Sequence, residues 1–163
     1  MDKKKLILTY VLQVLAIATL FIMVMPIIKI PGASVSVFEI VLDIEIWIDM
    51  EQYLFGIAGL ITIISLPLLI ISLEICKLCA CGVIKNKKLE LALYIINIVL
   101  AALVVGVIVN YFLGLGRTRG VSGLKLFQGE TWFKYATAFF YLHCVFSISM
   151  LVIACLNRTK KAK

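Results

Sequence analysis

Four long runs without charge constrain this chain more than any other feature of its sequence. A helix needs about 20 apolar residues to cross the roughly 30 Å hydrocarbon core of a bilayer. Runs of at least that length, flanked by charged residues, lie at 6–28, 54–75, 91–113 and 135–156, and only Glu74 is charged within them. The sequence therefore predicts an all-α membrane protein, a bundle of four transmembrane helices.

The composition excludes a soluble domain of this size. Of the 163 residues, 63% are hydrophobic and 15% are charged, with a mean hydropathy of +1.12, whereas soluble domains have about 45–50% apolar and about 25% charged residues. The same numbers exclude intrinsic disorder. A signal peptide has an apolar region of only about 7–15 residues, so the longer first run is predicted to be a retained helix. We expect one integral membrane domain over residues 1–163.

Lysine and arginine are distributed unevenly between the two ends of such a bundle. Eleven of the sixteen lie at the N-terminus, in the loop 76–90 between the second and third runs, or at the C-terminus. Cytoplasmic loops are enriched in these residues, so both termini and this inner loop are predicted to be cytoplasmic, in a protein of the cell membrane. Topology and anionic lipid headgroups explain the net charge of +7, and no nucleic-acid partner is expected.

The two outer loops, 29–53 and 114–134, have opposite charges. The first is acidic and the second mainly basic, and their candidate interaction residues are Glu39, Asp43, Glu45, Trp47, Asp49, Arg117, Arg119, Lys125 and Trp132. Apolar residues alternate with acidic ones and a tryptophan over 42–49, which favours a half-buried strand; an interfacial helix or irregular segment is the alternative. Residues 121–126 form a second strand-like stretch. Pairing of the two loops predicts a small extracellular β-hairpin or sheet.

Four cysteines are predicted at the inner ends of the helices: Cys76, Cys79, Cys81 and Cys155. Four thiols can hold a structural zinc ion, but a second closely spaced pair and a nearby histidine are missing, so these are weak metal candidates and no cofactor is predicted. Reversible acylation and plain reduced thiols are the alternatives. Four-helix enzymes that pass electrons between thiols and quinones are similar in size and topology. They depend on outer cysteine pairs, however, and neither outer loop here contains a cysteine.

Four polar side chains lie within the predicted spans: Gln13, Asn97, Asn110 and His143. Intramembrane ionisable residues are functional candidates by default, and His143, near the middle of the fourth run, is the sole histidine of the sequence. No Asp or Glu lies deep in a run to complete a proton relay, so interhelical hydrogen bonds are the favoured role of all four. The small residues Ala102 and Gly106 predict close helix packing, and Pro67 predicts a kink.

The sequence contains none of the common catalytic motifs, and no catalytic or cofactor-binding residue is assigned. We expect a non-enzymatic accessory, interaction or immunity-type subunit of a membrane system. Its partners would be the lipid bilayer and either another membrane protein or further copies of itself. The alternative is an oligomeric channel or transporter component with Asn97, Gly106 and Asn110 as a polar stripe. A second alternative is a membrane-embedded enzyme acting on lipids or thiols.

The predicted plan is similar to that of animal claudins, which also have four helices, inner termini and an outer sheet. Their Trp-Gly-Leu-Trp motif and the two cysteines that follow it do not occur in this sequence. The similarity is therefore one of general plan, and membership of that family is not expected.

Overall fold

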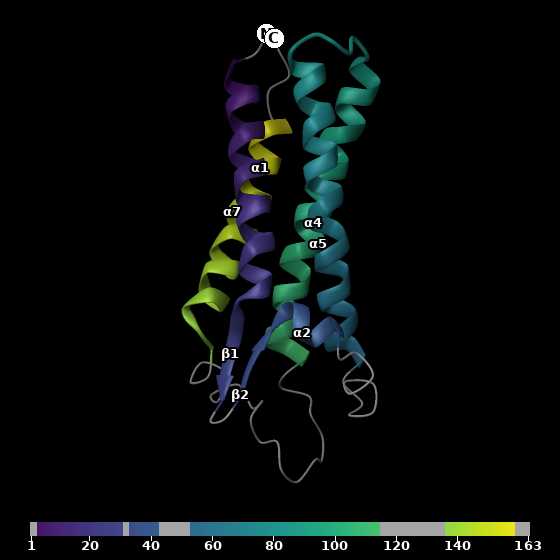
Figure 1. The fold of residues 1–163 in the computed structure, drawn as a ribbon. Coiled ribbons are helices and arrows are strands. Elements are labelled where there is room, and N and C mark those ends of the chain that lie inside the picture. The colour runs from purple at the N-terminus through teal and green to yellow at the C-terminus, as the bar shows by residue number, and fades with distance from the viewer. Residues whose placement is uncertain (1–2, 31–32, 43–52, 115–135, 159–163) are drawn as a thin grey trace.

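Four long helices dominate the computed structural model, which describes residues 3–30, 33–42, 53–114 and 136–158 (Figure 1). They are α1 (Lys3–Val24), α4 (Tyr53–Ala80), α5 (Lys87–Gly114) and α7 (Ala138–Arg158). Each contains a segment long and apolar enough to cross a membrane: Lys3–Val24, Gly59–Ala80, Lys87–Val109 and Ala138–Asn157. The predicted four-helix membrane bundle is confirmed at this level, and the chain is a multi-pass membrane protein.

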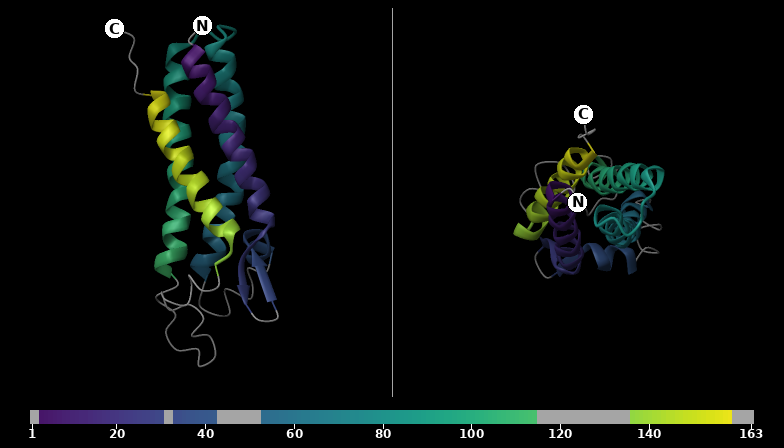
Figure 2. Two further views of the ribbon diagram at one scale, coloured as in Figure 1. Left: turned by 90° about the vertical axis from the view of Figure 1, so that its left-hand side faces the viewer. Right: turned by 90° about the horizontal axis from the view of Figure 1, so that it is seen from above.

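The helices form a closed square, seen from above in Figure 2. Helix α1 packs against α4 and α7, and α5 packs against the same two helices. Successive helices run in opposite directions, so the N- and C-termini and the short α4–α5 connection lie together at one end, the termini end (Figure 1). The opposite end is called the hairpin end below.

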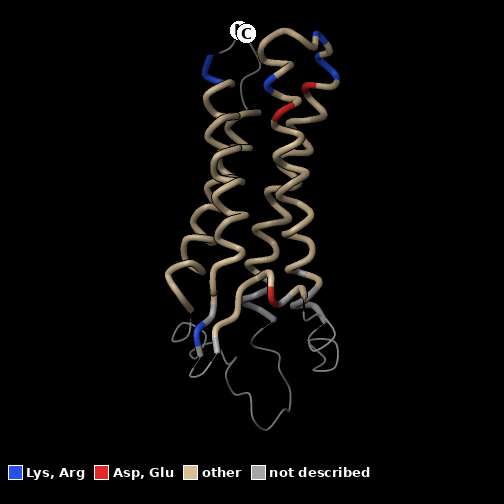
Figure 3. The backbone as a smooth tube through the Cα atoms, in the orientation of Figure 1, with Lys and Arg blue, Asp and Glu red and all other residues tan. Residues whose placement is uncertain are grey.

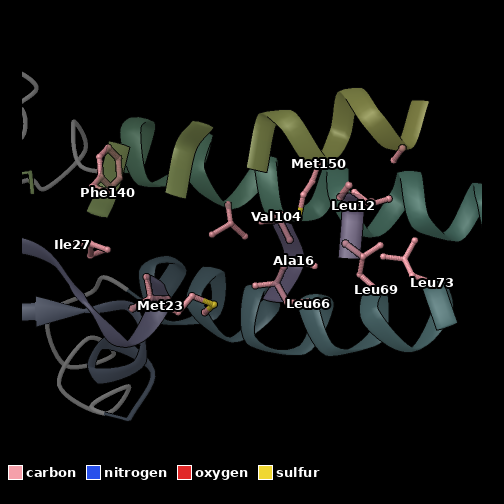
Figure 4. Packing of buried hydrophobic residues seen from close by; sticks show 14 residues of the cluster. Leu12, Ala16, Met23, Ile27, Leu66, Leu69, Leu73, Val104, Phe140 and Met150 are labelled. Carbon is pink, nitrogen blue, oxygen red and sulfur yellow. The ribbon is translucent and has the colours of Figure 1, made fainter. Parts of the chain in front are cut away.

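Apolar side chains from all four helices fill the centre of the bundle. Leu12 and Ala16 of α1, Leu69 of α4, Val104 of α5 and Met150 of α7 are each 0% exposed and lie close together in Figure 4. Large apolar side chains also cover the outside of the bundle; examples are Ile7, Val14, Phe21, Ile64, Ile71, Val99 and Val152. A helix that is apolar on all sides is typical of a membrane span, because lipid takes the place of water around it.

The first helix ends earlier than the sequence analysis expected. Helix α1 stops at Val24, and residues Pro26–Ile30 form strand β1, which pairs antiparallel with β2 (Ala33–Ser36). Proline has no backbone N–H to donate within a helix, so Pro26 is a natural boundary. The prediction of a helix over 6–28 is therefore too long at its C-terminal end, where the chain turns into a hairpin.

A short helix follows the hairpin and is fixed by a reciprocal cap. In α2 (Val37–Leu42), the backbone N–H of Ser36 donates to Glu39 Oε2 at 2.6 Å, and the backbone N–H of Glu39 donates to Ser36 Oγ at 3.1 Å. This Ser-x-x-Glu arrangement is a capping box, which satisfies two otherwise unpaired donors. The strand predicted over 42–49 thus begins at the last residue of a helix, and 43–49 lie outside the described residues, as does 121–126.

The hairpin and α2 cover the hairpin end of the bundle. Thr137, just before α7, donates from its Oγ1 to the carbonyl oxygen of Pro26 at 2.6 Å, and its N–H donates to the carbonyl oxygen of Ile27 at 3.0 Å. Helix α2 contacts both α1 and α4. Ile27 of β1 and Val37 of α2 are 0% exposed, so they extend the apolar core to this end.

The connection at the termini end is shorter than the predicted inner loop 76–90, because α4 continues to Ala80 and α5 begins at Lys87. Gly82 has a φ of +79° and donates to Cys79 O, while Val83 donates to Leu78 O, the paired hydrogen bonds of a Schellman C-cap. Asn86 Oδ1 accepts from the backbone N–H groups of residues 88 and 89, both at 3.1 Å, and so caps α5.

Candidate functional site

Most of the described charged residues lie toward the termini end of the bundle (Figure 3). Two clusters there join helices that are far apart in the sequence. The α1–α4 polar cluster consists of Tyr10, Gln13, Glu74 and Lys77, and the α1–α5 polar cluster consists of Lys5, Glu90 and Tyr94. At the hairpin end the described charged residues are Lys29 and Glu39.

Lys77 is the centre of the α1–α4 polar cluster. Its Nζ donates to Glu74 Oε1 at 2.7 Å and to Gln13 Oε1 at 2.8 Å, and lies 4.8 Å from the centroid of the Tyr10 ring. Gln13 Nε2 also donates to Glu74 Oε1. The ammonium therefore has an anion, an amide and an aromatic face as partners, and only 15% of the Lys77 side chain is exposed. This arrangement holds α1 against α4.

The α1–α5 polar cluster repeats this chemistry nearer the ends of the helices. Lys5 Nζ forms an ion pair with Glu90 Oε1 at 3.2 Å and lies 5.1 Å from the centroid of the Tyr94 ring, whose hydroxyl donates to Glu90 at 3.1 Å. Lys5 precedes Gln13 by eight residues, which is about 12 Å along α1. The two clusters therefore lie at different depths.

Two further polar contacts join helices inside the bundle. Asn97 is 2% exposed and donates from Nδ2 to Cys76 Sγ at 3.4 Å, which links α5 to α4. Asn157 is 3% exposed and donates from Nδ2 to Thr9 Oγ1 at 3.1 Å, which links α7 to α1. Of the four predicted intramembrane polar residues, Gln13 and Asn97 thus contact neighbouring helices. Asn110 lies in α5, but its side chain is outside the described part of the chain.

His143 has a different environment from the other polar residues. It lies in the second turn of α7, which begins at Ala138, so it is closer to the hairpin end than the sequence analysis expected. Its side chain is 1% exposed, and neither ring nitrogen has a hydrogen-bond partner among the described residues. Phe140, which precedes His143 by about one turn of α7, is also fully buried.

The inner cysteines are spread over different surfaces. Cys76 is buried against Leu93 and Tyr94, Cys79 is partly buried, and Cys81 and Cys155 are exposed. Within the described ranges, no three or more His, Cys, Asp or Glu side chains are grouped so that they could hold a metal ion. Cys76 and Cys79 lie in α4, Cys81 directly follows it and Cys155 lies in α7; α4 and α7 are diagonal in the square (Figure 2).

The outer interaction candidates divide into one described residue and eight others. Glu39 is exposed and caps α2, so its position has a structural cause. Asp43, Glu45, Trp47, Asp49, Arg117, Arg119, Lys125 and Trp132 lie outside the described residues.

The small-residue pattern of α5 faces outward. Ala102 and Gly106 are both exposed, and a Cβ atom built on Gly106 would meet nothing within 4 Å. The expectation that this pair packs α5 against its bundle neighbours is therefore wrong, because the buried side of α5 is formed by Ala101, Val104, Val107 and Ile108.

Sequence reasoning missed the charged and aromatic partners in both polar clusters. Glu74 and Lys77 were visible as an i, i+3 pair of opposite charge, a spacing that brings side chains together on a helix. Their contact with Tyr10 and Gln13 depends on which helices are neighbours, and no local signal gives that. The Ser36-x-x-Glu39 capping box, in contrast, is a sequence signal that was available.

Comparisons with protein-family models, with curated proteins and with solved structures find no match to this chain.

Proposed function

We propose that this protein is a non-enzymatic accessory or interaction subunit of a membrane system, of the kind that binds another membrane protein through its outer end. The observation on which the proposal rests is the closed apolar core. Leu12, Leu69, Val104 and Met150 come from four different helices and are all 0% exposed. An apolar layer of this kind across the described part of the bundle disfavours an aqueous pore within one copy.

The polar interior residues support the same proposal. Asn97 is buried and bonded to Cys76, and the apolar layer of Leu69 and Val104 lies farther along the same two helices. A polar stripe that begins at Asn97 is therefore interrupted within the bundle. Interhelical hydrogen bonds inside membranes are worth about 0.6 kcal/mol on average. We assign this role, the attachment of α5 to α4, to the contact between Asn97 and Cys76.

The hairpin end provides a supported platform for a partner. The bonds of Thr137 to β1 and the capping box of α2 hold this end against the bundle. Loops that bind partners are commonly positioned by a rigid scaffold. In the sequence, the acidic segment 43–51 follows α2 and the basic segment 117–125 follows α5.

We further propose that both termini are cytoplasmic in the cell membrane. Lys5, Lys77, Lys85, Lys87 and Lys88 lie toward the termini end, whereas Lys29 is the single described basic residue at the hairpin end. An excess of lysine in short loops favours the cytoplasmic side. In a variant without the native cysteines, a membrane-impermeant thiol reagent should label a cysteine at position 43 in intact cells and leave one at position 161 unlabelled. The opposite labelling would reverse the orientation.

Affinity purification tests the function. The tagged full-length protein, expressed at its native level and purified in mild detergent, should bring a stoichiometric membrane protein that mass spectrometry identifies. Neutralising Asp43, Glu45 and Asp49 together should weaken that association if the acidic segment meets a basic partner. The matched control neutralises Lys85, Lys87 and Lys88 at the other end and should leave the association unchanged.

Two results would count against the proposal. Recovery of the protein alone, as a defined homo-oligomer, would favour the channel or transporter alternative. Equal loss of the partner in the acidic and the lysine variants would exclude a specific role for the outer end.

A further inference from the structure

Glu74 has one carboxylate oxygen, Oε2, that is not engaged by the described residues and lies on the outer side of the bundle. Both intramolecular bonds, from Gln13 Nε2 and Lys77 Nζ, go to Oε1. The second oxygen, Oε2, accepts no hydrogen bond from any described residue, and the Glu74 side chain is 54% exposed. The two bonds to Oε1 orient the group, so an anionic acceptor is held in place on the outer surface between α1 and α4.

The depth of Glu74 corresponds to the edge of a bilayer. The twenty residues 54–73 that precede it in α4 contain no charge, and about 20 residues cross the hydrocarbon core. Val14 and Ile71, which lie toward the middle of the bundle from Gln13 and Glu74, are 64% and 57% exposed. Tyr10 of the same cluster is 51% exposed, and tyrosine is enriched at the level of the lipid headgroups.

The contacts of the cluster select the charge of a ligand. Lys77 is largely covered, and its Nζ is already engaged by Glu74, Gln13 and the ring of Tyr10. A lipid phosphate therefore finds no open cation here, whereas Glu74 Oε2 is an open anion. Carboxylates form their strongest hydrogen bonds with charged N–H donors, so the complementary group is an ammonium that still has its hydrogens.

We propose that Glu74 binds the primary ammonium of an aminophospholipid headgroup, of the phosphatidylethanolamine type, at the bilayer edge of the α1–α4 face. The headgroup donates to Glu74 Oε2, and the acyl chains lie along the exposed apolar residues of α1 and α4. This proposal is independent of which partner protein the chain binds and of which end is cytoplasmic.

Native mass spectrometry with defined lipids tests the site. The full-length protein is purified in detergent micelles with equimolar phosphatidylethanolamine, phosphatidylcholine and phosphatidylglycerol of identical acyl chains. We expect phosphatidylethanolamine to be enriched over phosphatidylcholine about fivefold, equivalent to about 1 kcal/mol. Mono- and dimethylated phosphatidylethanolamine should give intermediate enrichment, because each methyl group removes one N–H donor. This comparison of lipids uses the wild-type protein, so its result does not depend on whether a variant folds.

Glu74→Gln should reduce the enrichment to about one, because the amide keeps the size of the side chain and loses its charge. Glu90→Gln is the matched control. Glu90 also accepts through Oε1 alone from a lysine and a second residue, but it lies about 12 Å nearer the end of the bundle, and its side chain is 28% exposed. This variant should keep the preference.

Several outcomes would overturn the proposal. Equal binding of phosphatidylethanolamine and phosphatidylcholine, or preference for phosphatidylglycerol, would exclude ammonium recognition. Retention of the preference in Glu74→Gln, or its equal loss in Glu90→Gln, would place the recognition elsewhere. Photo-crosslinking from position 74 to a basic segment of a partner protein, without lipid adducts, would assign the carboxylate to protein binding.

Discussion

The buried polar residues of this bundle differ in whether their polar atoms have hydrogen-bond partners. Lys77 and Asn97 have partners on a neighbouring helix, so each joins two segments that the chain alone does not connect. His143 is as deeply buried, but both of its ring nitrogens are unpaired among the described residues. A buried polar group without a partner costs about 1–3 kcal/mol. Lys77 therefore stabilises the bundle and His143 destabilises it, whereas Asn97 has one paired group, Nδ2, and an Oδ1 that is unpaired among the described residues.

His143→Leu should therefore leave the stability of the protein unchanged or raise it by about 1 kcal/mol, because the replacement removes two polar atoms that no described residue satisfies. The measurement is unfolding of the purified protein by increasing SDS in mixed micelles, followed by circular dichroism. Phe140→Ala, at a position that is also fully buried in α7, provides the scale and should cost about 3 kcal/mol. A decrease of more than 1 kcal/mol in His143→Leu would show that the imidazole does have a stabilising partner.

At the scale of secondary-structure elements, a single side chain attaches the hairpin to the helical bundle. Thr137 is the connection between α7 and β1, which lie far apart in the sequence, and its hydroxyl donates to Pro26 O at 2.6 Å. Helix α1 ends at Val24, so the Pro26 carbonyl that accepts this bond lies outside the helix. This bond therefore fixes the hairpin against the bundle at the point where α1 has ended.

Thr137→Val should loosen the hairpin, because it keeps the shape of the side chain and removes the donor. A neutral hydrogen bond contributes about 1 kcal/mol, equivalent to about fivefold faster amide exchange if the hairpin opens locally. Hydrogen exchange of the backbone amides of β1 and β2 measures this, and Thr137→Ser, which keeps the hydroxyl, should exchange as the wild type does. Equal exchange rates in the valine and serine variants would contradict a role for this bond.

The sequence could predict the helical spans and the signals at their ends, but it could not predict the contacts between helices. The four spans follow from hydrocarbon thickness alone, so charge-free runs were sufficient to find them. Helix ends depend on local chemistry that was present in the sequence: Pro26, Ser36 with Glu39, and Gly82. The contacts of Lys5 with Glu90 and of Lys77 with Gln13 depend on the order of helices around the square. Every helix is apolar on all sides, so periodicity does not indicate which face is inward, as the outward Gly106 shows.

At the scale of the whole molecule, charge and apolar packing are separated along the bundle axis. Both polar clusters lie toward the termini end, and the capped α2 and the hairpin lie at the other (Figures 1 and 3). Between them the buried side chains are mainly apolar, and the buried polar ones among them are Thr19, Thr62, Ser65, Ser72, His143 and Ser147. Charged residues at the two ends of a mainly apolar bundle favour a fixed depth of the protein in a bilayer. The buried hydroxyls of Thr19 and Ser147 donate to the carbonyl oxygens of Leu15 and His143 in their own helices, which disfavours their use in a path for ions or protons.

Purified full-length protein in liposomes should therefore give potassium and proton fluxes no greater than those of protein-free vesicles. Leu69 and Val104 separate Asn97 from the hairpin end, and filling this core with water would expose apolar side chains at about 25 cal/mol per Å². An added ionophore provides the positive control for vesicle integrity. A flux that requires the protein and disappears in Asn97→Leu would contradict the closed core, because a buried amide can influence permeation only if water reaches it. A flux insensitive to Asn97→Leu would instead assign conduction to an interface between copies, where the outward face of α5 around Gly106 would be the first surface to substitute.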